Sequence, residues 1–286
     1  MIKTRTGQVI ETNAKQNKLL KKLYGSVLGR VFLKTLTAPA ISRAAGAFMD
    51  SRPSKILIKP FIRRSGIDTS EYMMNGFRSY NDFFTRVIKP DKRPVDRVPS
   101  HLISPCDSKL TVHKIGRNSI FRIKGSRYRV SDLLQNEFLA KRFGGGYCLI
   151  FRLEVNDYHR YCYIDSGTKS ENTFIAGELH TVNPIALERY NIYKRNCREY
   201  TVLHTDNFGD VVQVEVGAML VGRIVNHHGE TAFRRGDEKG KFEFGGSTIV
   251  MLFGRDSIAV DEDILRNSAE GIETVVKCGE KIGIKA

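Results

Sequence analysis

The stretch KFEFGGSTIVMLF, residues 241–253, places two glycines directly before an apolar run. From Ser247 to Phe253 the chain reads STIVMLF, which predicts a buried β-strand. Such a strand ordinarily begins after a polar turn, whereas this one begins after Gly245 and Gly246. Glycine leaves the peptide carbonyl before Ser247 with little steric cover and tolerates strained backbone. The start of this strand is therefore of interest for chemistry as well as for folding.

Short apolar or alternating runs recur after His101, separated by Gly, Asn and Asp, and they predict a β-rich domain. The predicted strands lie within residues 109–115, 147–155, 172–182, 198–205, 211–225, 247–253 and 274–284. Residues 131–143 predict a helical insertion, and residues 63–98 predict a helix followed by a connection that several prolines interrupt. The predicted fold class is α+β, with a basic amphipathic N-terminal helical region followed by a β-rich, barrel- or sandwich-like domain.

Composition is that of a folded globular protein, with 286 residues, of which 41% are hydrophobic and 27% charged. The net charge of +15 predicts an anionic partner, and both nucleic acid and an anionic membrane fit that charge. Residues 1–70 carry eight Lys and six Arg against three acidic residues, so +11 of the charge is N-terminal. We therefore expect the basic partner surface mainly in this part of the chain.

Apolar residues near the N-terminus recur at three- and four-residue spacing, with basic residues between them. The apolar set is Leu19, Leu20, Leu23, Val27, Leu28, Val31 and Phe32, and the basic set is Lys15, Lys18, Lys21, Lys22 and Arg30. The pattern predicts a basic amphipathic helix. Two interpretations fit it equally well: a helix that packs on its own domain, and a helix that lies on a membrane surface.

Neither a membrane-spanning helix nor an export signal is predicted. No run of about 18 apolar residues occurs, and residues 1–11 lack the apolar core of a signal peptide. We therefore expect the protein to stay in the cytosol. The cysteines are odd in number and form no CxxC pair, so we expect free thiols and no zinc site; they are Cys106, Cys148, Cys162, Cys197 and Cys278.

Three places set reactive side chains beside turn-forming or strand-ending residues. They are residues 104–110 with Asp107, residues 153–163 with His159, and the GGST stretch with Ser247. Each alone has a structural explanation, as a turn aspartate, a buried histidine and a β-bulge. Together they supply the carboxylate, base and hydroxyl that nucleophilic catalysis needs, although sequence does not show that they meet. Because glycine uncovers the preceding carbonyl, the serine could attack its own chain.

The combination resembles the phosphatidylserine decarboxylase proenzymes, a pyruvoyl-dependent, self-cleaving family. The family's aspartate, histidine and cleavage motifs appear in the family's order as SPCD (104–107), DYHR (157–160) and GST (246–248). Further matches are FRSYNDFFTR (77–86), KPDKRPV (89–95), LHTVNP (179–184), VGAMLVGRI (216–224) and VKCGEKIG (276–283). The resemblance covers about residues 70–286 and is specific because several separate motifs agree.

The chain departs from the family's pattern at four positions. Gly245 stands where the family often has leucine, and Ser108 replaces the glycine that usually follows the aspartate. Cys162 stands where many members have a second histidine, which leaves His159 as the only base that the motif offers. We assign Cys162 a structural role. Cys197 interrupts what is often an Asn-Glu-Arg run.

The resemblance implies a catalytic triad of Asp107, His159 and Ser247. In it the aspartate orients the histidine, the histidine takes the serine proton, and the serine attacks the Gly246 carbonyl. Cutting at Gly246–Ser247 leaves a pyruvoyl group made from Ser247 as the cofactor, with no metal. The pyruvoyl ketone forms a Schiff base with phosphatidylserine, which loses CO2 and becomes phosphatidylethanolamine after His159 returns a proton.

The sequence pattern predicts two domains, and the same resemblance implies two products. Residues 1–98 are the helical, basic, membrane-associating region, and residues 99–286 are the β-rich catalytic domain. Self-cleavage gives a β chain, residues 1–246, and an α chain, residues 247–286. The expected partners are phosphatidylserine and an anionic membrane surface, not nucleic acid. The α and β chains are expected to stay associated, with a dimer left open, on the cytoplasmic side of the cell membrane as a peripheral protein.

Two other interpretations remain at this point. One is a self-processing pyruvoyl decarboxylase that acts on a soluble amino acid or another amine, with the same chemistry at Ser247. The other is a non-enzyme, either a carrier module like the lipoyl and biotinyl domains or a nucleic-acid-binding β-barrel. No lysine stands at the carrier position within a Met-Lys pair, and RNP- and KH-like stacking motifs are absent from the sequence.

Overall fold

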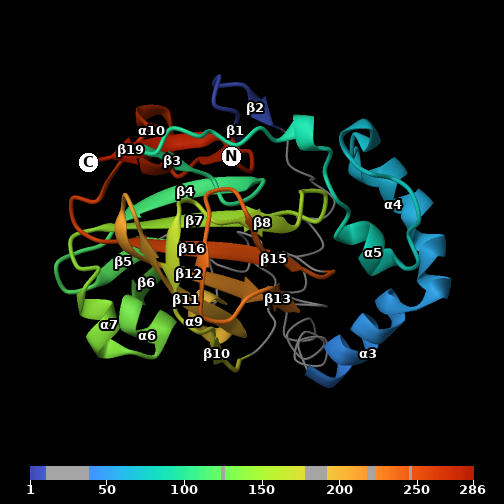
Figure 1. Ribbon diagram of the computed structural model, residues 1–286, viewed down its shortest axis with the longest axis horizontal. Coiled ribbons are helices and arrows are strands. Elements are labelled where there is room, and N and C mark those ends of the chain that lie inside the picture. The colour runs from blue at the N-terminus through green and yellow to red at the C-terminus, as the bar shows by residue number, and fades with distance from the viewer. Residues whose placement is uncertain (11–38, 124–125, 178–191, 218–222, 245–246) are drawn as a thin grey trace.

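The computed structural model describes residues 1–10, 39–123, 126–177, 192–217, 223–244 and 247–286. Its centre is a large, mostly antiparallel β-sheet, flanked at one end by a group of helices (Figure 1). The fold is therefore α+β and rich in strands, as the sequence predicts.

The central sheet has eleven strands among the described residues. Its order is β14 (Thr231–Phe233), β9 (Gly167–Lys169), β11 (Arg198–Thr205), β12 (Gly209–Gly217), β16 (Ser247–Phe253), β7 (Tyr147–Leu153), β4 (Ser108–Lys114), β18 (Glu273–Val276), β1 (Ile2–Lys3) and β2 (Val9–Ile10), with β10 (Thr173–Ile175) paired to β11. The predicted strand Ser247–Phe253 is correct to the residue, and every residue in it is buried. It lies in the middle of the sheet, between β12 and β7.

One face of the central sheet is covered by two small sheets of three strands each. They are β13 (Ile224–Asn226), β15 (Glu238–Phe242) and β8 (Arg160–Cys162), and β17 (Ile258–Val260), β19 (Lys281–Lys285) and β3 (His101–Ile103). Side chains from all three sheets form one apolar core, which includes Leu110, Phe151, Ile249, Phe242 and Ile282. This packing is sandwich-like. The predicted barrel is wrong, because the central sheet does not close and ends at the edge strands β14 and β2.

The opposite face carries a second apolar core, built on alternate residues of the same strands, such as Ile150, Val214 and Val250. The elements that cover it include the two-stranded sheet β5 (Ile120–Ile123) and β6 (Ser126–Arg129) and the helices α6 (Val130–Leu134), α7 (Glu137–Lys141) and α9 (Ile192–Arg195). The predicted helical insertion at residues 131–143 is thus two short helices. The helix α10 (Glu262–Ala269) packs against β4 and β18.

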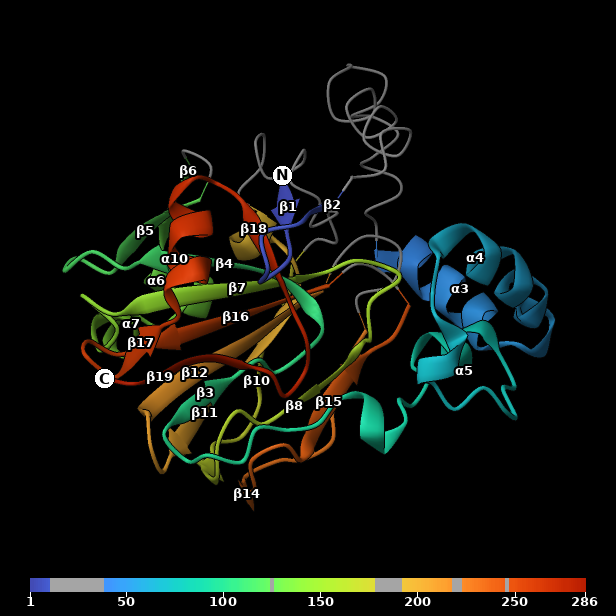
Figure 2. The same ribbon diagram turned by 90° about the horizontal axis from the view of Figure 1, so that it is seen from above.

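A separate group of helices lies beyond one end of the central sheet (Figures 1 and 2). It contains α3 (Pro39–Asp50), α4 (Ile58–Ser65) and α5 (Tyr80–Phe84), with the 3₁₀ turns η1 (Arg52–Leu57), η2 (Thr69–Glu71) and η3 (Pro90–Lys92). Buried aromatic residues of α5 form the centre of this group and contact Val155 and Phe244, which follow the ends of β7 and β15. The helices are therefore packed onto the end of the sheet where β16 begins.

The first ten residues differ from the expectation that residues 1–98 form one helical region. Ile2 and Lys3 pair with β18 in parallel, so the chain begins as part of the central sheet. Arg5 fixes this segment through ion pairs with Asp261 and Asp263. The predicted basic helix around residues 15–32 lies outside the described residues. Among the helices that the structure describes, none is both long and apolar enough to span a bilayer.

Candidate active site

Ser247 is the first residue of the central strand β16. Its main chain pairs with Leu153 on β7 and with Gly217 on β12, so the residue is held from both sides. The side chain is buried, with 1% exposure, and its Oγ has no hydrogen-bond partner within the described structure. A buried hydroxyl without a partner is uncommon, because losing hydration without a compensating hydrogen bond costs about 1–3 kcal/mol. No contact among the described residues therefore fixes the orientation of this hydroxyl.

His159 lies immediately before β8 and is fully buried. The Phe84 ring of α5 packs against the imidazole, with ring centroids 4.1 Å apart. The imidazole Nδ1 lies 3.0 Å from the main-chain oxygen of Asp157. A carbonyl oxygen only accepts, so Nδ1 carries the proton and donates it. Nε2 is therefore the unprotonated nitrogen, and it has no partner among the described residues.

The surroundings of His159 keep the ring neutral. Burial is the largest cause, and the positive charge of Arg86 adds to it, so that the pKa of His159 is lowered from 6.5 to about 3. The negative charge of Asp107 acts in the opposite direction and favours the protonated ring. The imidazole is therefore neutral across the physiological pH range, with Nε2 unprotonated.

Asp107 lies just before β4 and is 2% exposed. Its carboxylate accepts hydrogen bonds from Arg93, at 2.7 Å from Nη2 and 2.9 Å from Nε, and from the main-chain N–H of Cys278 at 2.9 Å. Burial by itself would raise the pKa of Asp107, but the hydrogen bonds from Arg93 and the charges of Lys277 and Arg93 lower it below its usual value. The carboxylate is therefore ionised.

The structure brings these three residues to one end of the central sheet. On β4 and β7, Lys109 pairs with Arg152, so the preceding residue Ser108 lies beside Leu153. Leu153 pairs in turn with Ser247 on β16. Residues in one such row point to the same face of a sheet. Leu153 belongs to the core shared with β8 and β15, so Ser247 faces the layer in which His159 lies.

The expected hydrogen bond between Asp107 and His159 is not among the contacts of the described residues. The main-chain oxygen of Asp157 fixes the tautomer of His159, and Asp107 is engaged by Arg93 and Cys278. The physical reason is local. The turn between β7 and β8 folds the Asp157 carbonyl back onto the histidine two residues later, whereas Asp107 points toward the turn between β18 and β19.

Several residues that support the site were not singled out from the sequence as functional. Arg86 is 1% exposed, donates to the main-chain oxygens of Asn156 and Asp157, and stacks on the Tyr72 ring. Asn81 accepts a hydrogen bond from the N–H of Phe244, three residues before Ser247. The signal that could have found Arg86 and Asn81 is the FRSYNDFFTR match at residues 77–86, which contains both of them.

A buried ion pair fixes the turn that carries the histidine. Lys109 Nζ lies 2.7 Å from both carboxylate oxygens of Asp157, and this carboxylate also accepts from the N–H of Glu154 at 2.7 Å. Lys109 and Asp157 are both largely buried. Breaking a buried pair of this kind by removing one partner costs about 3–5 kcal/mol. The side chain of Asp157 thus holds the turn while its main-chain oxygen holds His159.

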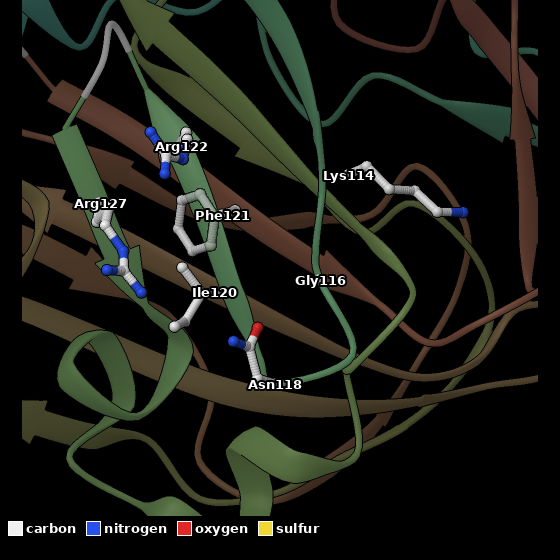
Figure 3. A pocket seen from close by; sticks show the side chains of 7 residues that line it. All are labelled: Lys114, Gly116, Asn118, Ile120, Phe121, Arg122 and Arg127. Carbon is white, nitrogen blue, oxygen red and sulfur yellow. The ribbon is translucent and has the colours of Figure 1, made fainter.

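A surface hollow of about 520 Å³ lies at the other end of β4 from this site (Figure 3). It is lined by Lys114, Gly116, Asn118, Ile120, Phe121, Arg122 and Arg127. None of the three candidate catalytic residues lines it. The candidate active site is thus identified by its side chains and not by this hollow. In the part of the chain that the structure describes, no group of three or more His, Cys, Asp and Glu side chains is placed to hold a metal ion.

The family model described as phosphatidylserine decarboxylase matches residues 80–284. The chain belongs to the phosphatidylserine decarboxylase family. It is 50% identical over 269 residues to phosphatidylserine decarboxylase proenzyme 2 of Clostridium acetobutylicum, which covers 94% of this chain and 92% of that protein. It is 43% identical over 273 residues to the phosphatidylserine decarboxylase proenzyme of Ruminiclostridium cellulolyticum, which covers 93% of this chain and 91% of that protein.

Family membership makes the chain an enzyme, a decarboxylase whose curated relatives are named as proenzymes. The phosphatidylserine decarboxylase proenzyme of Clostridium perfringens, 41% identical over 268 residues, is a further relative of this kind. The matched residues 80–284 include α5 and all three candidate catalytic residues.

Proposed function

We propose that the protein converts phosphatidylserine to phosphatidylethanolamine and CO2 after cutting its own chain at Gly246–Ser247. The observation that carries this proposal is the pair of unpartnered atoms at one end of the sheet: the Ser247 hydroxyl and Nε2 of a neutral His159. Buried hydroxyls without a partner also occur at Ser108 and Thr248, so it is the combination of a hydroxyl and a neutral imidazole nitrogen that supports the proposal. Membership of a family whose members are named proenzymes supports the same proposal.

The self-cleavage uses groups of this chain and one water. His159 Nε2 takes the proton of Ser247, and the Ser247 Oγ attacks the Gly246 carbonyl carbon, so that an ester replaces the peptide bond. Loss of the α proton of Ser247 expels the Gly246 carboxylate and leaves a dehydroalanine with a free amino group. Its imine tautomer takes up one water and releases ammonia, which leaves a pyruvoyl group. The products are residues 1–246 and residues 247–286.

The buried, unpartnered Ser247 position suits a pyruvoyl group, because the group needs no counter-charge and stays within the shared core. Such a group would supply a ketone able to condense with the substrate amine and a neighbouring carbonyl able to accept the electrons of the bond to CO2. His159 is the residue we assign to return a proton to the substrate carbon. Asp107 stabilises the positive charge that His159 acquires when it takes a proton.

The two products stay together because the α chain supplies strands inside the sheet. β16 pairs along its whole length with β12 on one side and β7 on the other, and β18 pairs with β4 and β1. Removing residues 247–286 would leave the central sheet without its middle strand. We therefore infer a permanent complex of the α and β chains. The lipid substrate places the protein at an anionic membrane surface, as a peripheral protein on the cytoplasmic side, reached through its basic N-terminal region.

The direct test replaces the attacking hydroxyl. We expect Ser247→Ala to remain a single chain and to release no CO2 from phosphatidylserine, because neither the ester nor the pyruvoyl group can form. Thr201→Ala on β11 is the matched control and should be cut normally, since Thr201 is fully buried, carries an unpartnered hydroxyl and belongs to none of the three motifs. A Ser247→Ala protein that decarboxylates phosphatidylserine would refute the mechanism.

The substrate is tested with the cleaved protein. Phosphatidylserine in mixed micelles and free serine are supplied at equal concentration, and CO2 release is measured for both. We expect release from the lipid alone. Equal release from free serine would favour a decarboxylase of soluble amines, with the same self-cleavage.

A further inference from the structure

Two cysteines lie in contact beside the candidate active site. The Sγ atoms of Cys162, at the end of β8, and Cys278, in the turn between β18 and β19, are 3.6 Å apart. Both cysteines contact the main-chain oxygen of Pro105. The N–H of Cys162 donates to this oxygen at 2.9 Å, and the Cys278 Sγ lies 3.4 Å from the same oxygen. A disulfide has an S–S length of about 2.05 Å, so closing one here needs a movement of about 1.5 Å.

The turn that carries Cys278 is fixed against the loop that carries Asp107. The Ser104 N–H donates to the Glu280 oxygen at 2.8 Å, and the Gly279 N–H donates to the Ser104 oxygen at 2.9 Å. Gly279 has a positive φ of 81°, and a Cβ there would lie 3.0 Å from the Val95 Cα. The sulfur contact is therefore built into a rigid turn and does not depend on a loosely held side chain.

The two cysteines lie on opposite sides of the proposed cleavage point. Cys162 belongs to residues 1–246 and Cys278 to residues 247–286. We propose that Cys162 and Cys278 form a reversible disulfide that joins the α and β chains covalently beside Asp107. The interchain character of the bond rests on the proposed self-cleavage, whereas the bond itself does not.

The oxidant that we name is a hydroperoxide, of which hydrogen peroxide is the smallest. Cys278 is the more exposed of the two thiols, since Cys162 is 4% exposed and Cys278 is half-buried. The Cys278 thiolate attacks one peroxide oxygen to give a sulfenic acid and one water after protonation. The Cys162 sulfur then displaces the hydroxyl group of that sulfenic acid, which leaves as a second water. Two thiols and one peroxide thus give one disulfide and two waters.

The reaction is expected to be slow. The hydrogen bond to Cys162 and burial raise the pKa of the Cys278 thiol, so little of it is thiolate at neutral pH. Reduction by a dithiol reverses the bond, so the pair is a modification site and not a permanent crosslink.

The test uses the purified full chain with and without hydrogen peroxide, followed by blocking of free thiols and digestion with trypsin without reductant. We expect a crosslinked peptide that joins residues 161–169 to residues 278–281 and has lost two hydrogens. On a denaturing gel without reductant, the α and β chains should run as one species, and dithiothreitol should separate them. Cys162→Ser and Cys278→Ser should each abolish both signals.

Cys148→Ser is the matched control, because Cys148 is buried in the core on the opposite face of the central sheet and should leave the crosslink unchanged. Absence of the crosslinked peptide, or its replacement by one that contains Cys106 in residues 98–109, would overturn the proposal. Failure of self-cleavage looks different, because the protein would then run as a single chain even with dithiothreitol. The uncut Ser247→Ala protein should still form the crosslinked peptide.

Discussion

At the scale of single residues, the site depends on one imidazole with one free nitrogen. Asp157 holds Nδ1 of His159 through its main-chain oxygen, and Arg86 donates to that same oxygen from the other side. Phe84 covers the ring, and burial keeps it neutral. The ring is therefore neutral at physiological pH, and its Nε2 can accept a proton without first losing one.

This state of His159 predicts an unusual pH dependence. The pKa of about 3 in the folded chain lies below the ordinary 6.5 of a histidine, so the ring stays neutral from pH 8 down to pH 5. We expect the self-cleavage rate of freshly translated proenzyme to change less than about twofold over this range. An ordinary histidine would lose about thirtyfold of its neutral form by pH 5. A rate that falls with a midpoint near pH 6.5 would contradict the assignment.

Part of the site could be predicted at this scale and part could not. The motif positions predict Asp107, His159 and Ser247 as the site, and the strand register puts the chain beside each of them at the same end of the sheet. The sequence favoured Asp107 as the group that orients the histidine, because a triad needs a carboxylate. A main-chain oxygen can also orient a histidine. Every residue has such an oxygen, so the sequence of side chains does not predict this contact.

At the scale of elements, the short helix α5 connects the helical group to the site. Ser79 caps it by accepting from the N–H of Asp82, and its buried aromatic side is fixed against Phe244 and His159. The Thr85 oxygen directly after the helix accepts from Arg160 at 2.8 Å. One five-residue helix thus sets the position of both the histidine and the chain before Ser247.

Removing the Phe84 ring should disturb both stability and chemistry. Phe84 is fully buried, so Phe84→Ala is expected to lower the free energy of unfolding by about 3–5 kcal/mol. The cavity also frees the imidazole to rotate, so self-cleavage should slow in the fraction that stays folded. Denaturant unfolding and the rate of appearance of the α chain measure the two effects.

The matched control for this change is Phe138→Ala on α7, where the ring is 82% exposed. We expect it to alter the free energy of unfolding by less than about 0.5 kcal/mol and to leave cleavage unchanged. If Phe84→Ala cleaves at the normal rate, α5 has only a structural role.

Among the elements, the long strands were predictable, and the three-residue strands β3 and β8 were not. β7, β11, β12 and β16 have seven to nine residues and carry enough apolar positions to define a period. β3 and β8 have three residues each, which is too short for a pattern. These short strands are stabilised by the layer they pack on. The residues of that layer lie elsewhere in the chain, so the local sequence does not reveal the strands.

At the scale of the whole molecule, basic residues are concentrated in two parts of the sequence, the N-terminal region and the residues that line the hollow of Figure 3. The basic N-terminal residues belong to the part of the chain before the helices that cover the site, whereas the hollow of Figure 3 lies at the other end of β4. Total charge alone does not distinguish them. Removing the same number of charges from each set in turn tests whether membrane binding depends on the N-terminal residues or only on the net charge of +15.

Replacing Lys15, Lys18, Lys21 and Lys22 by Gln should weaken binding to vesicles that contain phosphatidylserine. Each basic residue near an anionic surface contributes about 1 kcal/mol, which is about fivefold per lysine. This design keeps residues 1–10, which pair with β18. Co-sedimentation with the vesicles is the measurement.

The matched control removes the same number of charges from the hollow, by replacing Lys114, Arg117, Arg122 and Arg127 with Gln. Lys114, Arg122 and Arg127 line it, and Arg117 lines the neighbouring hollow. We expect nearly normal sedimentation. Equal losses for the two sets of changes would show that the N-terminal charges have no special role.

The most direct test of self-cleavage is the intact mass of the purified protein under denaturing, reducing conditions. We predict two chains, of which the smaller covers residues 247–286 and is lighter by one ammonia than the same 40 residues with an N-terminal serine. That mass reports the position of the cut and the pyruvoyl group together. A single uncut chain that persists after incubation with membranes, or a small fragment that begins with an intact serine, would contradict the account.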